Sequence, residues 1–191
     1  MTTRTHRKNR RPHDRGAIAV EFAIAATLLV TLFFGVLEVG VALKSRAMIT
    51  DASGEGARVA AAQPRTSGFQ NQTLAAIQGV VNANKVKSID YVVIYRADPA
   101  TGLHYKGEGI ETCFDSCWRF ELIDGAFAQK LGAAWDHNKI AACGDIDDTD
   151  WLGVYVRGHH TPITGFIGGT RRFTDTTIMR FEPMPPGVRC R

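Results

Sequence analysis

One stretch of this chain limits its possible folds more than any other. Residues 17–43, AIAVEFAIAATLLVTLFFGVLEVGVAL, contain no lysine or arginine, and their only charged side chains are Glu21 and Glu38. As a helix rising about 1.5 Å per residue, this run reaches about 40 Å, which exceeds the ~30 Å hydrocarbon core of a bilayer. A core helix of a soluble protein does not need so long an apolar run. We therefore predict a transmembrane helix over residues 17–43.

The residues before this run carry an unusual share of the charge. Residues 1–16 contain six arginines or lysines and one aspartate, which give this segment a net charge of +5. The whole chain has a net charge of +4, so residues 17–191 sum to −1. A body without net positive charge does not fit a nucleic-acid-binding protein, and no nucleic-acid partner is expected. Basic residues beside a span stay in the cytoplasm, which predicts that the C-terminal part lies outside it.

A cleaved secretory signal is a second interpretation of the apolar run. Its apolar segment would be 7–15 residues long and followed by small residues at the cut site, whereas LKSRAMITDA at residues 43–52 offers a poor site. An uncleaved single-pass anchor, carrying an extracytoplasmic domain that binds some partner, stays open as the alternative function.

The junction between the basic tail and the apolar run carries a distinctive pattern. Gly16 closes the tail, and Glu21 and Phe22 follow at the fifth and sixth positions beyond it. A carboxylate inside a span is costly. A cut after Gly16 would give Ala17 a free ammonium group one helical turn from Glu21, where it could pair with Glu21 of the same or a neighbouring chain. Otherwise Glu21 reaches toward the interface or is protonated.

This junction and the long apolar helix resemble a type IV prepilin of the Flp class, and more closely the TadE-like pseudopilins of the tight-adherence secretion system. FGVLEVG at 34–40, EGAR at 55–58 and the closing strand TDTTIMRFEP at 174–183 agree with this resemblance. It covers residues 11–62 and 151–183. The resemblance is weak over residues 65–150, where the chain is longer than is usual for the family and contains cysteines.

The resemblance implies a function without catalysis. A prepilin peptidase would cut the chain after Gly16 at the cytoplasmic face, with Ala17, Glu21 and Phe22 forming the rest of the processing site. The product would be a minor, pilin-like component that helps assemble or anchor a type IVb pilus or secretion apparatus. Its partners would be the peptidase, other pilins or pseudopilins, inner-membrane components of the apparatus and the lipid bilayer.

Beyond the span, the helical pattern continues over residues 44–62. Gln63-Pro64 should end this helix, since the residue before a proline resists helical geometry. Gly54 and Gly56 each weaken a helix by about 1 kcal/mol relative to alanine, which indicates a kink or close helix packing there.

The remaining residues predict an α+β head domain over 65–191, with a short second helix and a small, mostly antiparallel sheet. The chain would then comprise a basic leader (1–16), a transmembrane helix (17–43), its continuation (44–62) and the head. The expected elements are a helix over 73–83, strands over 88–96, 152–157 and 171–181, a turn at 98–102, and a segment at 123–135 that leans helical.

Four cysteines, Cys113, Cys117, Cys143 and Cys190, lie in the expected extracytoplasmic part. An even number of cysteines outside the cytoplasm favours disulfides, and four cysteines allow three connectivities. Zinc bound by these cysteines with His159 or His160 is one alternative, although one C-x-x-x-C pair is a weak zinc signal, and free or intermolecular thiols are another.

An acidic run and a histidine pair complete the candidates for chemistry. Asp145, Asp147, Asp148 and Asp150 could bind calcium, but the run lacks EF-hand spacing, so a solvated acidic turn is expected. His159 and His160 have no nucleophile or phosphate-binding loop beside them and are expected to be ordinary strand-end histidines. We therefore expect no enzymatic activity, cofactor or resident metal.

Overall fold

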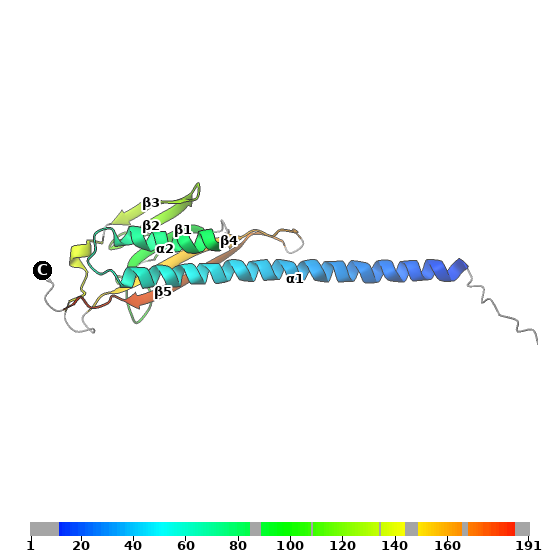
Figure 1. Cartoon of the computed structure of the whole chain (residues 1–191), viewed down its shortest axis with the longest axis horizontal. Helices are drawn as coiled ribbons and strands as arrows, with labels where there is room; N and C mark the ends of the chain where they lie inside the picture. The colour runs from blue at the N-terminus through cyan, green and yellow to red at the C-terminus, as the bar shows by residue number, and fades with distance from the viewer. Residues whose placement is uncertain are drawn as a thin grey trace, which may run out of the picture.

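The computed structural model describes residues 12–84, 89–107, 109–133, 135–143, 149–165 and 168–185. In these ranges the chain forms a long helix, a short second helix and a five-stranded antiparallel sheet, which confirms the predicted α+β class (Figure 1). The elements are α1 (Pro12–Ala61), α2 (Phe69–Asn84), β1 (Ile89–Ala97), β2 (Cys117–Ile123), β3 (Ala126–Ala133), the 3-10 turn η1 (His137–Lys139), β4 (Trp151–His160) and β5 (Arg171–Arg180).

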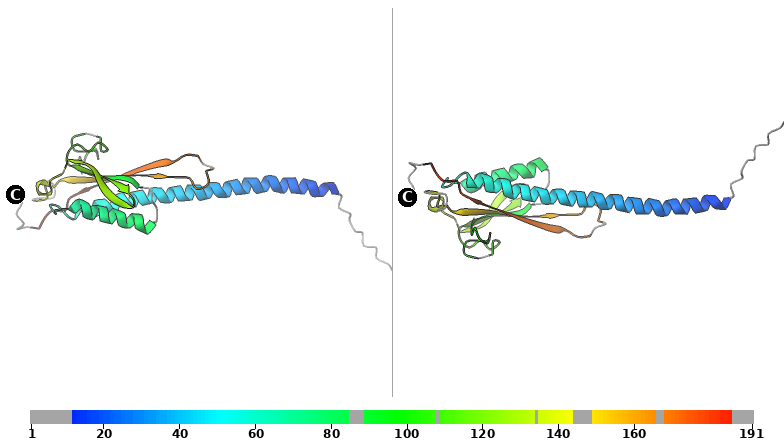
Figure 2. Two further views of the ribbon diagram at one scale, coloured as in Figure 1. Left: turned by 90° about the horizontal axis from the view of Figure 1, so that it is seen from above. Right: turned by 90° about the horizontal axis from the view of Figure 1, so that it is seen from below.

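Helix α1 runs without interruption through the apolar segment and into the head, and its N-terminal part projects away from the rest of the molecule (Figures 1 and 2). It starts at Pro12, where a proline suits the first turn of a helix. It ends at Ala61, just before the predicted stop at Gln63-Pro64. None of the side chains at 16–37 is buried by the chain itself.

The sheet has the order β3-β2-β1-β4-β5, and every neighbouring pair is antiparallel. The expected strands near 88–96, 152–157 and 171–181 correspond to β1, β4 and β5. The leaning toward helix at 123–135 is wrong, because these residues form the turn and second strand of the β2–β3 hairpin. Asp124 and Gly125 both have positive φ angles, 50° and 84°, which suit the tight turn of a hairpin.

The two helices cover one face of the sheet, while the loop between β1 and β2 lies on the other face (Figure 2). Helix α2 forms because its apolar residues recur every three or four positions, which gives it one buried side. Phe69 at the start of α2 is the centre of the core and meets Trp118, Trp135 and Phe181 edge-on, with ring centroids 5.3, 6.2 and 6.0 Å away.

Gly56 allows the closest approach of α1 to its neighbours. A Cβ atom at this position would lie 2.8 Å from Cδ1 and Cγ1 of Ile77 on α2 and 3.3 Å from Cγ1 of Val154 on β4. At Gly54, two residues earlier, an added Cβ would meet no atom within 4 Å. Of the two sequence expectations for this region, close packing is therefore correct, and α1 continues as a single helix.

These two glycines predict opposite effects of the same substitution. Gly54→Ala should stabilise the fold by up to about 1 kcal/mol, since alanine favours a helix and has room there. Gly56→Ala should destabilise it by about 1–3 kcal/mol, because the new methyl group overlaps the fully buried Ile77. Denaturant unfolding of the detergent-solubilised chain, followed by tryptophan fluorescence, measures both. Equal effects of the two substitutions would contradict the close packing at Gly56.

Candidate functional site

The residues of the predicted processing site lie together near the start of α1. Gly16, Ala17, Glu21 and Phe22 are all exposed, and Glu21 follows Ala17 by one helical turn. The helix from Gly16 to Ala61 is long and apolar enough to cross a membrane, which fits a single-pass anchor. The processing role of these residues stays a prediction from the sequence.

Farther along α1, Glu38 is almost completely buried, with 4% of its surface exposed. Its carboxylate accepts hydrogen bonds from the backbone amides of Ile163 (3.0 and 3.2 Å) and Thr164 (3.1 Å). The hydroxyl of Thr164 (2.9 Å) and Nε2 of His160 (3.1 Å) bond to it as well. We call this set of contacts the Glu38 clasp.

The clasp joins α1 to the end of β4. His160 is the last residue of β4, and the chain turns immediately after it, so two successive amides of the turn face the helix. The sequence pattern suggests only an ordinary strand-end histidine at this position and misses its contact with Glu38. The available signal was Glu38 itself, because a carboxylate in an apolar run needs hydrogen-bond donors from elsewhere in the chain.

A second polar contact ties α1 to β5. The Ser53 hydroxyl donates a hydrogen bond to the carboxylate of Asp175 and lies 2.9 Å from Oγ1 of Thr177. Ser53 is fully buried in the structure. Two adjacent strands are therefore attached to the same helix at two positions, β4 at Glu38 and β5 at Ser53.

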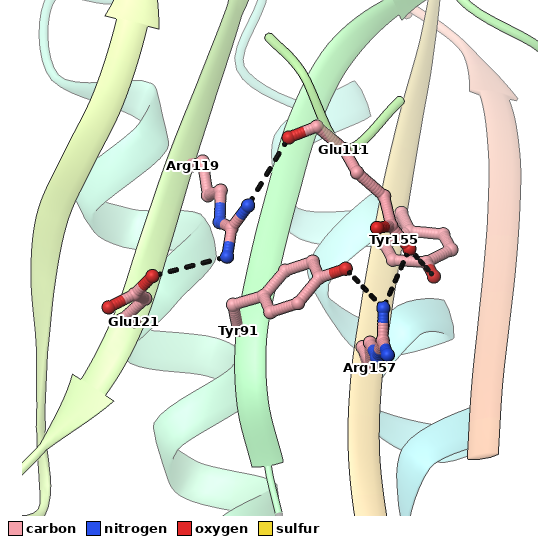
Figure 3. Close-up of polar contacts among 6 residues, drawn as sticks. All are labelled: Tyr91, Glu111, Arg119, Glu121, Tyr155 and Arg157. Atoms are coloured by element: carbon pink, nitrogen blue, oxygen red, sulfur yellow. Dashed lines mark hydrogen bonds and ion pairs between the residues drawn. The ribbon is translucent and has the colours of Figure 1, made fainter. Parts of the chain in front are cut away.

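On the opposite face of the sheet lies a network of charged and aromatic residues, which we call the open-face cluster (Figure 3). Its members are Tyr91, Glu111, Arg119, Glu121, Tyr155 and Arg157. Arg157 donates from Nη1 to the Tyr91 hydroxyl (3.0 Å) and to Oε1 of Glu111 (2.9 Å). The Tyr155 hydroxyl also donates to Glu111 (3.0 Å).

Arg119 completes this cluster on the other side of Tyr91. Its guanidinium lies 4.0 Å above the Tyr91 ring and donates to Glu121 at 3.2 Å. Hydrogen bonding to Tyr91, assisted by Tyr155 and Arg157, holds the pKa of Glu111 below its ordinary value although partial burial opposes this. The cluster is thus a network of charges paired with one another on the face of the sheet opposite the helices.

A shallow depression of about 520 Å³ adjoins the open-face cluster. Besides members of the cluster, it is lined by Asp90, His159, Thr161, Thr170 and Arg172. His159 is paired with Asp90 at 2.5 Å, so both strand-end histidines bond to carboxylates. No group of three or more histidine, cysteine or acidic side chains that could hold a metal occurs among the residues that the structure describes.

The loop between β1 and β2, which carries Glu111, also contains a disulfide between Cys113 and Cys117, with Cα atoms 5.5 Å apart. Cys143 is also disulfide-bonded, and Cys190 lies outside the described residues. The disulfide accords with the expected oxidation of these cysteines and leaves Cys113 and Cys117 unable to bind zinc as thiolates.

The acidic run falls mostly outside the described residues, since Asp145, Asp147 and Asp148 are not among them. Asp150 is described and is buried. It accepts hydrogen bonds from Nη2 of Arg96 (2.7 Å) and from the backbone amide of Ala141 (2.9 Å). Both of its carboxylate oxygens are therefore occupied by contacts within the head.

The described geometry defines a head domain attached to a helix that can serve as a membrane anchor. The family model of TadE-like protein matches residues 16–58, which cover most of α1, and this confirms the resemblance inferred from the junction. Members of this family are structural, non-enzymatic proteins associated with tight-adherence pili. No curated protein and no solved structure matches the chain.

The clasp predicts a local response to loss of the Glu38 carboxylate. Glu38→Ala removes the acceptor of two backbone amides, so Ile163 and Thr164 should exchange hydrogen about tenfold faster or more. Glu21→Ala, at an exposed carboxylate on the same helix, is the matched control and should leave both amides unchanged. Hydrogen–deuterium exchange resolved by fragmentation measures this effect. Unaltered protection in Glu38→Ala would show that the clasp does not hold the turn.

Proposed function

We propose that this chain is a non-enzymatic, pilin-like minor component that helps to assemble or anchor a tight-adherence type IVb pilus or secretion apparatus. The observation that carries the proposal is the coincidence of the TadE-like match, residues 16–58, with an exposed apolar helix that projects from the head. A projecting helix of this kind supplies an anchor in the membrane and, in an assembly, an apolar surface for neighbouring subunits.

The proposed arrangement in the membrane places residues 1–16 in the cytoplasm and the head, residues 65–191, outside it. The basic tail supports this orientation. Ala17 and Glu38 are 21 positions apart, which corresponds to about 32 Å of helix and thus to one hydrocarbon core. Glu38 is also the first buried side chain described on α1, so the head begins where the crossing ends.

Processing is the second part of the proposal. A prepilin peptidase would act after Gly16, which is exposed on α1 together with the residues that follow it. The new ammonium of Ala17 would then lie one turn from Glu21 and offset the cost of that carboxylate in the membrane. If the pairing joins neighbouring chains, it also sets the register between this subunit and its pilin partners.

The head supports one alternative function, that of an unprocessed membrane anchor that presents a binding domain. The TadE-like match ends at residue 58, before the sheet begins, and the open-face cluster beside its depression is a surface suited to polar contacts. An unprocessed single-pass anchor that presents a binding domain would use the same head. The two functions differ in processing, because only the pilin-like component loses residues 1–16.

The processing proposal predicts that Gly16 cannot be replaced by a larger residue. A peptidase pocket that accepts only glycine would exclude a branched side chain, so Gly16→Leu should accumulate as the full-length precursor. The matched control is Gly35→Leu, at another glycine of α1 with open space around it, which should still be cut. Intact mass of the membrane-extracted chains measures both. A mature form of Gly16→Leu that begins at Ala17 would refute the proposal.

The assembly proposal predicts a different outcome for Glu21. Glu21→Ala should insert into the membrane and still be cut after Gly16, but it should fail to co-purify with its pilin partners, because the carboxylate that pairs with their ammonium groups is gone. Glu21→Asp keeps the charge and is expected to retain part of the assembly. Processing state and co-purification are measured on the same membranes. Normal assembly of Glu21→Ala would contradict the pairing between chains.

A further inference from the structure

We propose that the end of the head formed by residues 161–165 with Arg171 and Arg172 is a lipid-binding surface that rests on the outer leaflet of the membrane. Ile163 enters the boundary of the acyl chains, and the two arginines bind headgroup phosphates. We call this surface the membrane-facing end. The inference rests on the proposed crossing of the membrane by α1, and a crosslinking experiment separates the two.

The Glu38 clasp fixes the height of this surface along α1. The amides of Ile163 and Thr164 bond directly to Glu38, which lies about 32 Å of helix from Ala17 and thus at the far side of a hydrocarbon core. In Figure 1 the end of β4 and the start of β5 are the parts of the sheet that reach farthest toward the N-terminal end of α1. A crossing by α1 therefore brings this turn to the membrane surface.

An apolar side chain is displayed at this height. Ile163 is 73% exposed, although the backbone that carries it is held by the clasp. Pro162 lines a small cavity together with Val39 and Ala42 of α1, so the apolar surface continues from helix to turn. In water such a surface has an unfavourable hydration free energy, whereas the acyl boundary accepts it.

Two arginines at the start of β5 lie near this turn, since Arg171 lines a cavity with Pro162 and Arg172 lines a depression with Thr161, Asp90 and Glu111. The register of the sheet places Arg171 opposite His160 and Arg172 opposite His159, and Arg171 lines the cavity that contains Glu38. Both arginines are exposed, and the structure gives neither an ion pair among the described residues. Lys44 and Arg46 on α1 are exposed as well, within about 12 Å of helix beyond Glu38.

An apolar tip bordered by exposed cations matches the outer leaflet of a bilayer, which offers acyl chains beside anionic phosphates. The arginines fit phosphate well, since a guanidinium can donate two parallel hydrogen bonds to it. At the other end of the head, Phe114 is 69% exposed and lies within the loop between Cys113 and Cys117. Cys117 pairs with Tyr95, which is opposite Gly153 near the start of β4 and thus far from the turn after His160. Phe114 serves as the matched control.

The test is photocrosslinking of the full chain in vesicles of pure phosphatidylglycerol. Three variants each carry p-benzoylphenylalanine at one exposed position, in place of Ile163, Phe114 or Phe33 of the apolar run. Mass spectrometry after irradiation identifies adducts with lipid or with protein. Adducts with lipid at positions 163 and 33, and none at 114, are the expected result. Unchanged tryptophan fluorescence verifies that each variant is folded.

The outcomes separate the inference from the proposed anchoring. Lipid adducts at 33 without lipid adducts at 163 would overturn the inference and leave the anchoring intact. Absence of lipid adducts at both positions would contradict both. Adducts at 163 that join two chains, seen as a doubled mass, would assign this surface to a second copy of the chain and thereby overturn the lipid assignment.

A charge-removal variant tests the phosphate contacts. Arg171→Gln combined with Arg172→Gln should lower the yield of lipid adducts at position 163 several-fold in phosphatidylglycerol vesicles. Lys130→Gln combined with Lys139→Gln removes the same charge from exposed positions elsewhere on the head and should leave the yield unchanged. Equal yields in the two double variants would overturn the role assigned to the arginines.

Discussion

The arrangement of this protein depends on how the carboxylate of Glu38 is satisfied. A charged group in an apolar helix is tolerated only when hydrogen-bond donors meet it, and in this chain they come from residues 122–126 positions away. This contact joins α1 to the end of β4 and so determines which strand end packs against the helix at Glu38. Because the donors include backbone amides, the position of the turn is fixed as well as that of a side chain.

From this contact follows a division of α1 into two parts. Before Glu38 the helix is exposed and apolar, and beyond it Ser45, Met48, Ile49, Ala52 and Ser53 are buried against the head. Gly56 continues the contact by allowing α2 and β4 to approach. One continuous helix therefore contains both the exposed apolar part, which fits a membrane anchor, and a wall of the core.

The features that depend on local chemistry could be predicted from the sequence. The apolar run, the end of the helix before Gln63-Pro64 and the strand at β1 all follow from patterns within a few residues of one another. Residues 123–135 mislead because alanine, leucine, lysine and glutamine in β3 favour a helix, while pairing with β2 imposes the strand. The Asp124-Gly125 dipeptide was the local signal for a hairpin. No local signal could identify the partners of Glu38 or of Arg157.

The match to TadE-like proteins covers the helix, whereas the open-face cluster and the loop closed by Cys113–Cys117 belong to the part beyond the match. We propose that the helix provides membrane insertion and assembly. We propose as well that the head provides the surfaces for polar contacts with partners.

If the Glu38 clasp makes the membrane helix and the head one rigid body, the distance between them should be fixed. Spin labels attached through a non-natural amino acid in place of Leu28 and Thr174, both exposed, allow this distance to be measured by pulsed electron resonance in lipid nanodiscs. A rigid connection predicts a single narrow distance distribution that broadens in Glu38→Ala. A broad distribution in the otherwise unaltered chain would contradict it.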